Sequence, residues 1–384
     1  MRKICIVTGS RAEYGLLSSL MCLIQDDSEL ILQVIATNMH LSPEFGLTYK
    51  EIEKDGFRID KKVEMLLSSD TANGTTKSVG LATIGFADAY EDLKPDLLLV
   101  LGDRYEILAA VTAALFFKIP IAHLHGGEIT EGAYDDAIRH AITKMSHLHF
   151  TSTEEYRNRV IQLGEEPSRV FNVGAIGIDN IQHLKLLSRR QLEEDINFKF
   201  GEKCIMVTFH PVTLENNTAK DQIKNLLQVL QSIDDLRILF TLPNSDTDGR
   251  IISQLINQFV EENMDRSIVY ASLGQLRYLS ALQYVSAVIG NSSSGLIEAP
   301  SFNIPTLNIG NRQQGRLKTN SVVDCEPTVE DIKEKLLFVL SSNFKESCMH
   351  SMNPYQKKNT AKEILAVIKH FSLDKIIQKK FYNF

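Results

Sequence analysis

The sequence has few cysteines, and their spacing excludes two common kinds of site. The five cysteines lie far apart among 384 residues, and no CxxC pair occurs. An odd, scattered set of thiols in a long chain is typical of reduced cysteines, not of a disulfide framework or a structural zinc site. We therefore expect a cytoplasmic protein. No apolar run approaches the roughly 18 residues that a membrane-spanning helix needs, so no membrane partner is expected.

The sequence also lacks an excess of basic charge. Its formal net charge is -7, and its lysines and arginines are spread along the chain without a basic stripe. This distribution argues against a nucleic acid or a membrane surface as a partner. The small cluster at Lys375–Lys380 is interpreted as a solvated helix end and not as a binding patch.

Three signatures of cofactor and metal binding are absent. The first predicted strand, Lys3–Val7, is followed by a turn with one glycine, Gly9, instead of the GxGxxG of dinucleotide-binding proteins. The stretch Gly290–Gly295 lacks the lysine of an NTPase phosphate-binding loop. The histidines show no HxxxH or HExxH spacing, so we expect neither a metal nor a cofactor. These histidines are His123, His125, His140, His147 and His149.

The most informative stretch of the sequence is Asp96–His140. Two short apolar runs, Leu97–Leu101 and Ile119–Leu124, have the length and branching of buried strands. They flank a helical pattern over Glu106–Phe117, which predicts a βαβ unit of a parallel sheet. Ligands of such sheets bind outside the carboxyl ends of the strands, so the residues that follow both strands form one predicted site.

The same alternation of strands and helices continues along the sequence and predicts an α/β fold. A chain of 384 residues is too long for one ordinary core, so two domains are expected. We predict two doubly wound, Rossmann-like domains, residues 1–180 and 181–365, with the active-site cleft between them. The charged stretch Lys185–Lys203 marks their boundary, and the small, polar stretch Ser68–Ser78 is predicted to be a loop at the site.

Acidic side chains gather at the predicted edge of the first sheet. They are Asp103, Glu128, Asp135 and Asp136. Arg139 falls on the same helix face as the two aspartates that begin that helix. Carboxylates whose surroundings separate their pKa values are the usual groups for proton transfer. Two plainer interpretations stay open: Asp103 forms a structural pair with Arg104, and Asp135 and Asp136 only favour the helix dipole.

A second candidate site lies in the other half of the sequence. A strand end, three serines, a glycine and a helix follow one another at Gly290–Gly295 and predict a cradle for a diphosphate. A plain turn with an N-cap serine is the alternative. Glu298 is a candidate for ribose hydroxyls, and Arg312 for the phosphates. In the first half, Arg11 is a candidate anion contact, unless it is an ordinary surface arginine.

Seven short motifs stand at the predicted strand ends and helix starts. They are GSRAEYG at Gly9–Gly15, LGDR at Leu101–Arg104, HLHGGE at His123–Glu128, DDAIRHAITK at Asp135–Lys144, FHPVT at Phe209–Thr213, GNSSSGLIEAP at Gly290–Pro300 and NIGNRQQGR at Asn308–Arg316. In this order they resemble the hydrolysing UDP-N-acetylglucosamine 2-epimerases, which begin the synthesis of sialic acid and related nonulosonic acids in bacteria. The resemblance implies a GT-B fold of two Rossmann-like domains, with a C-terminal helix at 366–384 packed back on the first. It also implies a homodimer or homotetramer that needs no metal or nicotinamide.

The resemblance implies a reaction in two steps. Members of the family eliminate the nucleoside diphosphate across C1–C2 of the sugar to give a 2-acetamidoglucal, and then add water to release the free 2-epimerised sugar. By motif match, roles in proton transfer and sugar positioning fall to Asp103, Glu128, Asp135, His125, Asp136 and Arg139. Contacts to the nucleotide sugar fall to Arg11, Arg104, His210, Asn244, Ser292, Ser293, Glu298 and Arg312.

Two points stay open within the resemblance. Some members of the family have a proposed catalytic glutamate where this sequence has His125, so either His125 or Glu128 takes that role. The substrate is UDP-N-acetylglucosamine, which gives N-acetylmannosamine, or UDP- or GDP-linked N,N'-diacetylbacillosamine, which gives 2,4-diacetamido-2,4,6-trideoxymannose. The alternative functions are a non-hydrolysing 2-epimerase and a GT-B glycosyltransferase.

Overall fold

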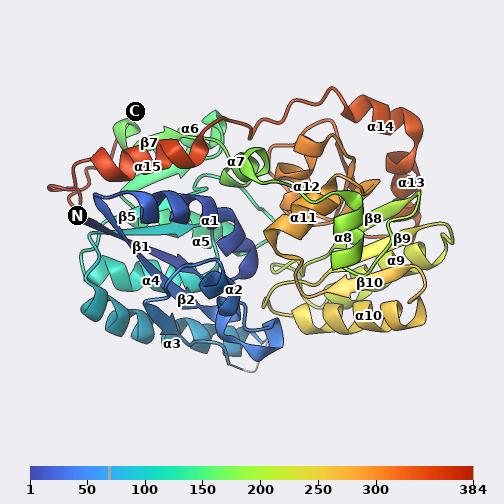
Figure 1. Ribbon diagram of the computed structural model, residues 1–384, viewed down its shortest axis with the longest axis horizontal. Coiled ribbons are helices and arrows are strands. Elements are labelled where there is room, and N and C mark those ends of the chain that lie inside the picture. The colour runs from blue at the N-terminus through green and yellow to red at the C-terminus, as the bar shows by residue number, and fades with distance from the viewer. Residues whose placement is uncertain (68–70, 384) are drawn as a thin grey trace. The chain divides into compact units, whose positions relative to one another are not determined.

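The computed structural model describes residues 1–67 and 71–383, which form two compact units. The first unit consists of Met1–Glu128, Asp135–Asn180 and Tyr355–Phe384. The second consists of Ile129–Tyr134 and Ile181–Pro354. In the colours of Figure 1, the red C-terminal segment thus belongs with the blue N-terminal one.

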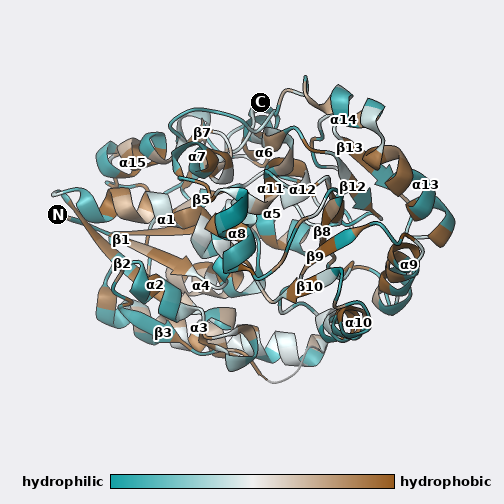
Figure 2. Ribbon diagram, turned by 45° about the vertical axis from the view of Figure 1, so that its right-hand side comes forward, coloured by the Kyte–Doolittle hydropathy of each residue, from teal (hydrophilic) through white to brown (hydrophobic). Residues whose placement is uncertain are grey.

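The first unit is built on a parallel, seven-stranded sheet with the order β3-β2-β1-β4-β5-β6-β7. The direction of chain progression reverses between β1 and β4, which is the topological switch point of a doubly wound sheet. Ile4–Val7 of β1 are apolar and fully buried, and Figure 2 shows the strand brown there, as is expected of a strand that helices cover on both faces. The strands are β1 (Arg2–Thr8), β2 (Leu30–Thr37), β3 (Lys61–Val63), β4 (Leu97–Leu101), β5 (Ile121–Leu124), β6 (Leu148–Thr151) and β7 (Val170–Asn172).

Several helices of this unit, α1, α4, α6 and α7, begin within four residues of the end of a strand. Ser10 caps the first of them, because its hydroxyl accepts a hydrogen bond from the Glu13 N–H at 3.3 Å. The helices are α1 (Arg11–Asp26), α2 (Tyr49–Lys54), α3 (Ala72–Leu93), α4 (Tyr105–Phe116), α5 (Asp135–Met145), α6 (Glu154–Gln162), α7 (Ile176–His183, which runs three residues into the second unit) and α15 (Thr360–His370).

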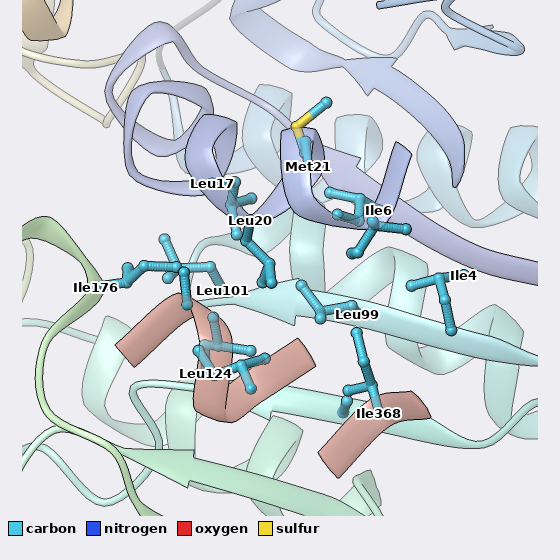
Figure 3. Packing of buried hydrophobic residues seen from close by; sticks show 14 of the residues in the cluster. Ile4, Ile6, Leu17, Leu20, Met21, Leu99, Leu101, Leu124, Ile176 and Ile368 are labelled. Atoms are coloured by element: carbon cyan, nitrogen blue, oxygen red, sulfur yellow. The ribbon is translucent and has the colours of Figure 1, made fainter. Parts of the chain in front are cut away.

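The core of the first unit joins residues from both ends of the chain. Ile4 and Ile6 of β1 lie in one cluster with Leu17 of α1, and Ile368 of α15 packs in the same cluster (Figure 3). All four side chains are fully buried. Burial of such a side chain stabilises a fold by about 2 kcal/mol, so α15 is an integral part of this unit.

The second unit repeats the architecture with a six-stranded parallel sheet in the order β10-β9-β8-β11-β12-β13. Its switch point lies between β8 and β11. The strands are β8 (Cys204–Thr208), β9 (Arg237–Thr241), β10 (Ser267–Tyr270), β11 (Ala287–Gly290), β12 (Thr306–Ile309) and β13 (Val322–Cys325). The helices are α8 (Arg189–Asp195), α9 (Ala219–Gln231), α10 (Gly249–Glu262), α11 (Gly274–Leu282), α12 (Ser294–Ile297), α13 (Val329–Leu340) and α14 (Ser342–Cys348). Together the two sheets confirm the predicted α/β fold of two doubly wound domains.

The segment Ile129–Tyr134 packs within the second unit although its neighbours on both sides belong to the first. The Glu131 N–H donates to the backbone oxygen of Gln314 at 3.1 Å, and the Tyr134 N–H donates to Thr213 Oγ1 at 3.1 Å. Gly132 leaves no room for a side chain, because a Cβ there would lie 2.7 Å from the backbone oxygen of Asn311.

Two predicted segments differ from the structure. The polar stretch Ser68–Ser78 is mostly helical, since α3 begins at Ala72 and Thr71 caps it by accepting the Gly74 N–H at 3.1 Å. Residues 68–70 of that predicted loop lie outside the described residues. The predicted C-terminal helix over 366–384 is also wrong, because α15 ends at His370. Beyond it the chain turns, which lets Leu373 and Ile376 pack into the same core as α15.

The lysine cluster near the C-terminus is only partly a solvated surface. Lys379 is 18% exposed, and its ammonium donates to both carboxylate oxygens of Glu165 at 2.8 and 2.9 Å. Lys144 and His149 bind the same buried carboxylate. Burial raises the pKa of Glu165, but these hydrogen bonds outweigh it and lower the pKa to about 2.

Candidate active site

Arg139 of α5 lies at the centre of the acidic cluster of the first unit. Its guanidinium is ion-paired with Asp103, which follows β4. It also donates to Asp136 Oδ1 at 3.3 Å and to the backbone oxygen of Glu128 at 2.9 Å. Arg139 is 1% exposed, whereas the Asp103 side chain is 22% exposed. A buried cation thus holds a carboxylate that solvent, and hence a ligand, can reach.

Asp103 is ion-paired with Arg139, and its chain neighbour Arg104 is ion-paired with a different carboxylate. Arg104 donates through Nε to Glu106 Oε1 at 2.8 Å. The reason is geometric: Arg104 is the N-cap residue of α4, and Glu106 lies in the first turn of that helix. Arg104, a predicted nucleotide-sugar contact, is thus held by a buried glutamate of its own helix.

His125 and Glu128 are in direct contact. His125 Nδ1 lies 3.0 Å from Glu128 Oε1, and Ser152 donates to the same oxygen at 2.8 Å. His125 Nε2 accepts the Ile176 N–H at 3.4 Å, which assigns the imidazole proton to Nδ1. His125 therefore donates to the glutamate and holds it in place, and this geometry favours Glu128 over His125 as the proton-transfer group.

The backbone around these two residues is unusual. His125 has φ +65°, a left-handed conformation that is uncommon for residues other than glycine. The two glycines after it, Gly126 and Gly127, face protein atoms. A Cβ at Gly127 would lie 2.4 Å from the backbone oxygen of Tyr156, and one at Gly126 would lie 2.9 Å from Thr143 Oγ1.

Two other histidines of the first unit, His123 and His140, make structural contacts. His123 is fully buried and contacts the Gly102 backbone oxygen at 2.7 Å and Thr143 Oγ1 at 3.1 Å. Burial lowers its pKa to about 3, so the ring is neutral at physiological pH. Burial also lowers the pKa of His140, which lies 3.5 Å from Asp136. Among residues 1–67 and 71–383, no group of three or more histidine, cysteine, aspartate or glutamate side chains is placed to hold a metal.

Arg11 and Asp135 complete the predicted set of the first unit. Arg11 begins α1 and is ion-paired with Glu51 of α2, so it is not an isolated surface arginine. Asp135 is the first residue of α5 and is half-buried. Asp103, Glu128, Asp136 and Arg139 are thus brought together, whereas Arg11 is held at a different helix start.

In the second unit, Asn291 organises the predicted diphosphate cradle. This fully buried residue accepts the His210 N–H at 2.7 Å and donates to the His210 backbone oxygen at 2.8 Å. Its own backbone oxygen accepts from Arg312 at 3.1 Å and from Gln313 at 2.9 Å. Asn291 therefore connects the ends of β8, β11 and β12, and two of the predicted contacts, His210 and Arg312, are bonded to it directly.

The remaining predicted contacts lie at the same edge of the second sheet. Ser292 and Ser293 follow β11 and are half-buried, and Glu298 follows the single turn of α12. Asn244 is half-buried in the loop between β9 and α10. Gly290 is essential at this turn, because it has φ +130° and a Cβ would lie 1.9 Å from the Thr208 backbone oxygen.

Four residues at these sites escaped the sequence analysis, namely Glu13, Glu106, Asn291 and Gln313. The sequence analysis gave none of them a role. Glu13 stands in the motif GSRAEYG, Asn291 in GNSSSGLIEAP and Gln313 in NIGNRQQGR, whereas Glu106 lies in none of the motifs. Contacts over 81 residues, such as that between Asn291 and His210, cannot be read from local patterns.

The two doubly wound sheets, with a carboxylate cluster on one and a serine-rich cradle on the other, define a GT-B-type α/β protein. The family model described as UDP-N-acetylglucosamine 2-epimerase matches residues 23–369. The chain therefore belongs to the UDP-N-acetylglucosamine 2-epimerase family.

Similar proteins agree with this assignment. The chain is 44% identical over 383 residues to the GDP/UDP-N,N'-diacetylbacillosamine 2-epimerase (hydrolyzing) of Campylobacter jejuni subsp. jejuni serotype O:2, covering 100% of this chain and 99% of that protein. It is 39% identical over 375 residues to the polysialic acid biosynthesis protein P7 of Escherichia coli, and the match covers 97% of this chain and 94% of that protein. The crystal structure of UDP-GlcNAc 2-epimerase from Neisseria meningitidis bound to UDP-GlcNAc has the same fold, with a TM-score of 0.79 at 19% identity. The match covers 95% of this chain and 99% of that chain. In the described part of the chain, no helix has both the length and the apolar character that a membrane crossing requires.

Proposed function

We propose that this protein is a hydrolysing nucleotide-sugar 2-epimerase. The observation that carries the proposal is the cluster around Arg139, in which the accessible Asp103 carboxylate is ion-paired with a buried guanidinium at the carboxyl edge of the first sheet. Proton removal from a carbon atom needs a positioned, ionised base, and this arrangement supplies one. The full-length identity of 44% to a hydrolysing 2-epimerase supports the same reaction.

The proposed first step is an elimination. Asp103 takes the proton from C2 of the sugar, the electron pair forms the C1=C2 double bond, and the C1–O bond to the nucleoside diphosphate breaks. Arg139 orients the carboxylate and, because it is buried, keeps that orientation without exchange with water. The products of this step are a 2-acetamidoglucal and the free nucleoside diphosphate.

The proposed second step is hydration. A proton is delivered to C2 from the other face of the ring, and water adds to C1, which releases the free 2-epimerised sugar. Glu128 and Asp135 are the proposed groups for this step, with Asp136 in support. The hydrogen bonds from His125 and Ser152 fix the Glu128 carboxyl group in one orientation.

Residues of the second unit are proposed to hold the nucleoside diphosphate. Asn291 fixes the backbone of His210 and the side chain of Arg312, so these two groups are preorganised before a ligand binds. Ser292 and Ser293 offer hydroxyl groups for the phosphates, and Glu298 and Asn244 offer acceptors and donors for the nucleoside. Arg11 and Arg104 are the proposed contacts from the first unit.

The proposed substrate is UDP- or GDP-linked N,N'-diacetylbacillosamine, with free 2,4-diacetamido-2,4,6-trideoxymannose as the product. The relative that is 44% identical over the full chain carries that activity in its name. UDP-N-acetylglucosamine is the second candidate, because the family model bears its name. The sugar products of these substrates belong to legionaminic acid and sialic acid synthesis respectively.

Proton NMR in deuterated water tests the function and the substrate together. The purified protein is incubated separately with UDP-N-acetylglucosamine, UDP-diacetylbacillosamine and GDP-diacetylbacillosamine. We expect a free 2-epimerised sugar with deuterium at C2 and a nucleoside diphosphate from one of them. A nucleotide-linked epimer would instead indicate the non-hydrolysing reaction, and no turnover with any of the three would contradict the proposal.

We also infer that the protein is a cytoplasmic homo-oligomer, a dimer or a tetramer. The five free thiols suit a reducing compartment. The packed helices α3 and α4 expose large apolar side chains, among them Ile84 at 66% and Phe116 at 78%. Such side chains are typical of surfaces that are covered in an oligomer.

A further inference from the structure

Two buried glutamates that the proposed mechanism does not use meet at the switch point of the first sheet. Glu13 lies in the first turn of α1, after β1, and Glu106 lies in the first turn of α4, after β4. Both touch Gly9. Glu13 Oε2 accepts the Gly9 N–H at 2.7 Å, and a Cβ at Gly9 would lie 2.4 Å from Glu106 Oε1. Only a glycine at this position lets the two carboxyl groups come this close to the backbone.

Each of these carboxyl groups has one oxygen without a hydrogen-bond partner. Glu13 is 6% exposed and Glu106 is fully buried, and neither Glu13 Oε1 nor Glu106 Oε2 has a partner among the described residues. A buried acceptor without a partner is costly, and such atoms are rare in folded proteins. A proton shared between the two carboxyl groups would give both of these oxygens a partner.

We propose that Glu13 and Glu106 share a single proton and that this singly protonated pair positions Arg104 and, through it, Asp103. The inference rests on the proposed function, in which Asp103 is the base. Neither glutamate touches the substrate in this proposal, and both are therefore positioning residues.

The charges around the pair favour the state with one proton over the state with no proton. Burial and, after it, the negative charge of Glu106 raise the pKa of Glu13 to about 8. The Gly9 N–H and the Arg104 guanidinium act against this rise, and the Asp103 carboxylate adds to it. With one proton the pair carries a single negative charge, which the guanidinium of Arg104, hydrogen-bonded to Glu106, balances.

The route from the pair to the proposed base is short. Glu106 Oε1 holds Arg104 Nε at 2.8 Å, and Arg104 is the chain neighbour of Asp103. Loss of the shared proton would place two negative charges side by side in a buried space. The Glu106 side chain would then move away from Glu13 and release the strand end that presents Asp103.

The pH dependence of turnover tests this proposal. Glu13→Gln is the matched variant, because its amide donates to Glu106 at every pH. We expect wild-type kcat to fall about tenfold between pH 7 and pH 9, with KM little changed. At pH 7, the kcat of Glu13→Gln is expected to stay within about threefold of the wild-type value. Between pH 7 and pH 9, its kcat is expected not to fall. Equal alkaline falls in both proteins, or an inactive but folded Glu13→Gln at pH 7, would overturn it.

Two further variants separate positioning from folding. Gly9→Ala drives a methyl group against the Glu106 carboxyl group and is expected to lower kcat at least tenfold with little change in KM. Glu91→Gln, an exposed residue of α3, is the control and should leave kcat and its pH dependence unchanged. If Gly9→Ala keeps the wild-type kcat, the pair has no positioning role.

A second readout needs no turnover and so separates this proposal from the proposed function. When the pKa of a carboxyl group is raised on folding, the contribution of its protonated form to the stability of the fold is lost as the pH rises through the folded pKa. From pH 6 to pH 9 the urea midpoint of the wild type is therefore expected to fall relative to that of Glu13→Gln. Parallel midpoints would disprove the shared proton even in an active enzyme. Diverging midpoints in a protein that turns over no nucleotide sugar would support the pair and reject the proposed function alone.

Discussion

At the scale of single residues, the cluster around Arg139 makes the sharpest prediction. Asp103→Asn keeps the shape of the side chain but removes its basicity. Turnover is expected to fall by at least about 100-fold, while the affinity for the nucleotide sugar stays within a few fold. Single-turnover kinetics and calorimetry measure the two quantities. Asp88→Asn, an exposed residue of α3, serves as the control; unchanged turnover in Asp103→Asn would sink the assignment of this residue as the base.

His125 allows a test of whether its ring donates a hydrogen bond or transfers a proton. His125→Asn retains a donor near the position of Nδ1, and asparagine tolerates the left-handed backbone at φ +65°. His125→Phe retains the ring and removes the donor. We expect His125→Asn to keep kcat within about tenfold and His125→Phe to lose about 100-fold. Equal losses in both variants would show that the imidazole itself transfers the proton.

The sequence predicted part of the site because strand ends are readable from local patterns. Asp103, Asp136 and Arg139 were found because an apolar run ends just before Asp103 and because the aspartate and the arginine are three residues apart on one helix. Glu13 and Asn291 were missed. Their roles come from partners far along the chain, and no periodicity encodes such contacts.

At the scale of the secondary-structure elements, the buried Glu165 fixes the end of the chain. Its carboxylate binds Lys144 of α5, His149 of β6 and Lys379, which lies after α15. The Tyr382 N–H also donates to the Gly164 backbone oxygen at 2.9 Å. The segment after α15 is thus held by polar contacts as well as by Ile376 in the core.

This cluster predicts a dependence of stability on pH. The pKa of Glu165 is lowered on folding, so its contribution is present above pH 4.5 and is lost as the pH falls towards about 2. Glu165→Gln should destabilise the fold by about 3 kcal/mol at pH 7, and by roughly half of that at pH 3. Urea unfolding at both pH values measures the difference.

Its control is the adjacent Glu166→Gln. The Glu166 side chain is 53% exposed, and its nearest contact to Arg169 is 3.9 Å long. An effect below about 0.5 kcal/mol is expected for such a surface pair. A loss in Glu166→Gln as large as that in Glu165→Gln would show that burial of the carboxylate is not the cause.

Strands were predicted better than segments whose structure depends on residues far away in the sequence. β4 matches its predicted range because five buried, apolar residues in a row fit only a strand between two helical layers. The helical start of α3 escaped prediction because its first turns, from Ala72 to Ser78, are small and polar and resemble a loop. The end of α15 escaped it because the chain leaves the helix to reach the core and Glu165.

At the scale of the whole molecule, the inferred oligomer can be tested on the first unit. Phe116→Asp and Ile84→Asp replace apolar side chains that are exposed on α4 and α3. A stable dimer usually buries at least about 1,200 Å², so a charge within that surface should produce monomers at micromolar concentration. Light scattering after gel filtration gives the mass. Met264→Asp, which changes an apolar residue of the second unit that is 77% exposed, should leave the mass unchanged.

The division of the first unit between the two ends of the chain has a consequence for its synthesis. A ribosome releases β1 and α1 first, but Ile364 and Ile368, which are fully buried in the core that β1 and α1 help to form, leave it only near the end of translation. Residues 181–354 are complete before that point. The half of the protein that is made first is therefore expected to finish folding last, with its apolar face in need of protection until then.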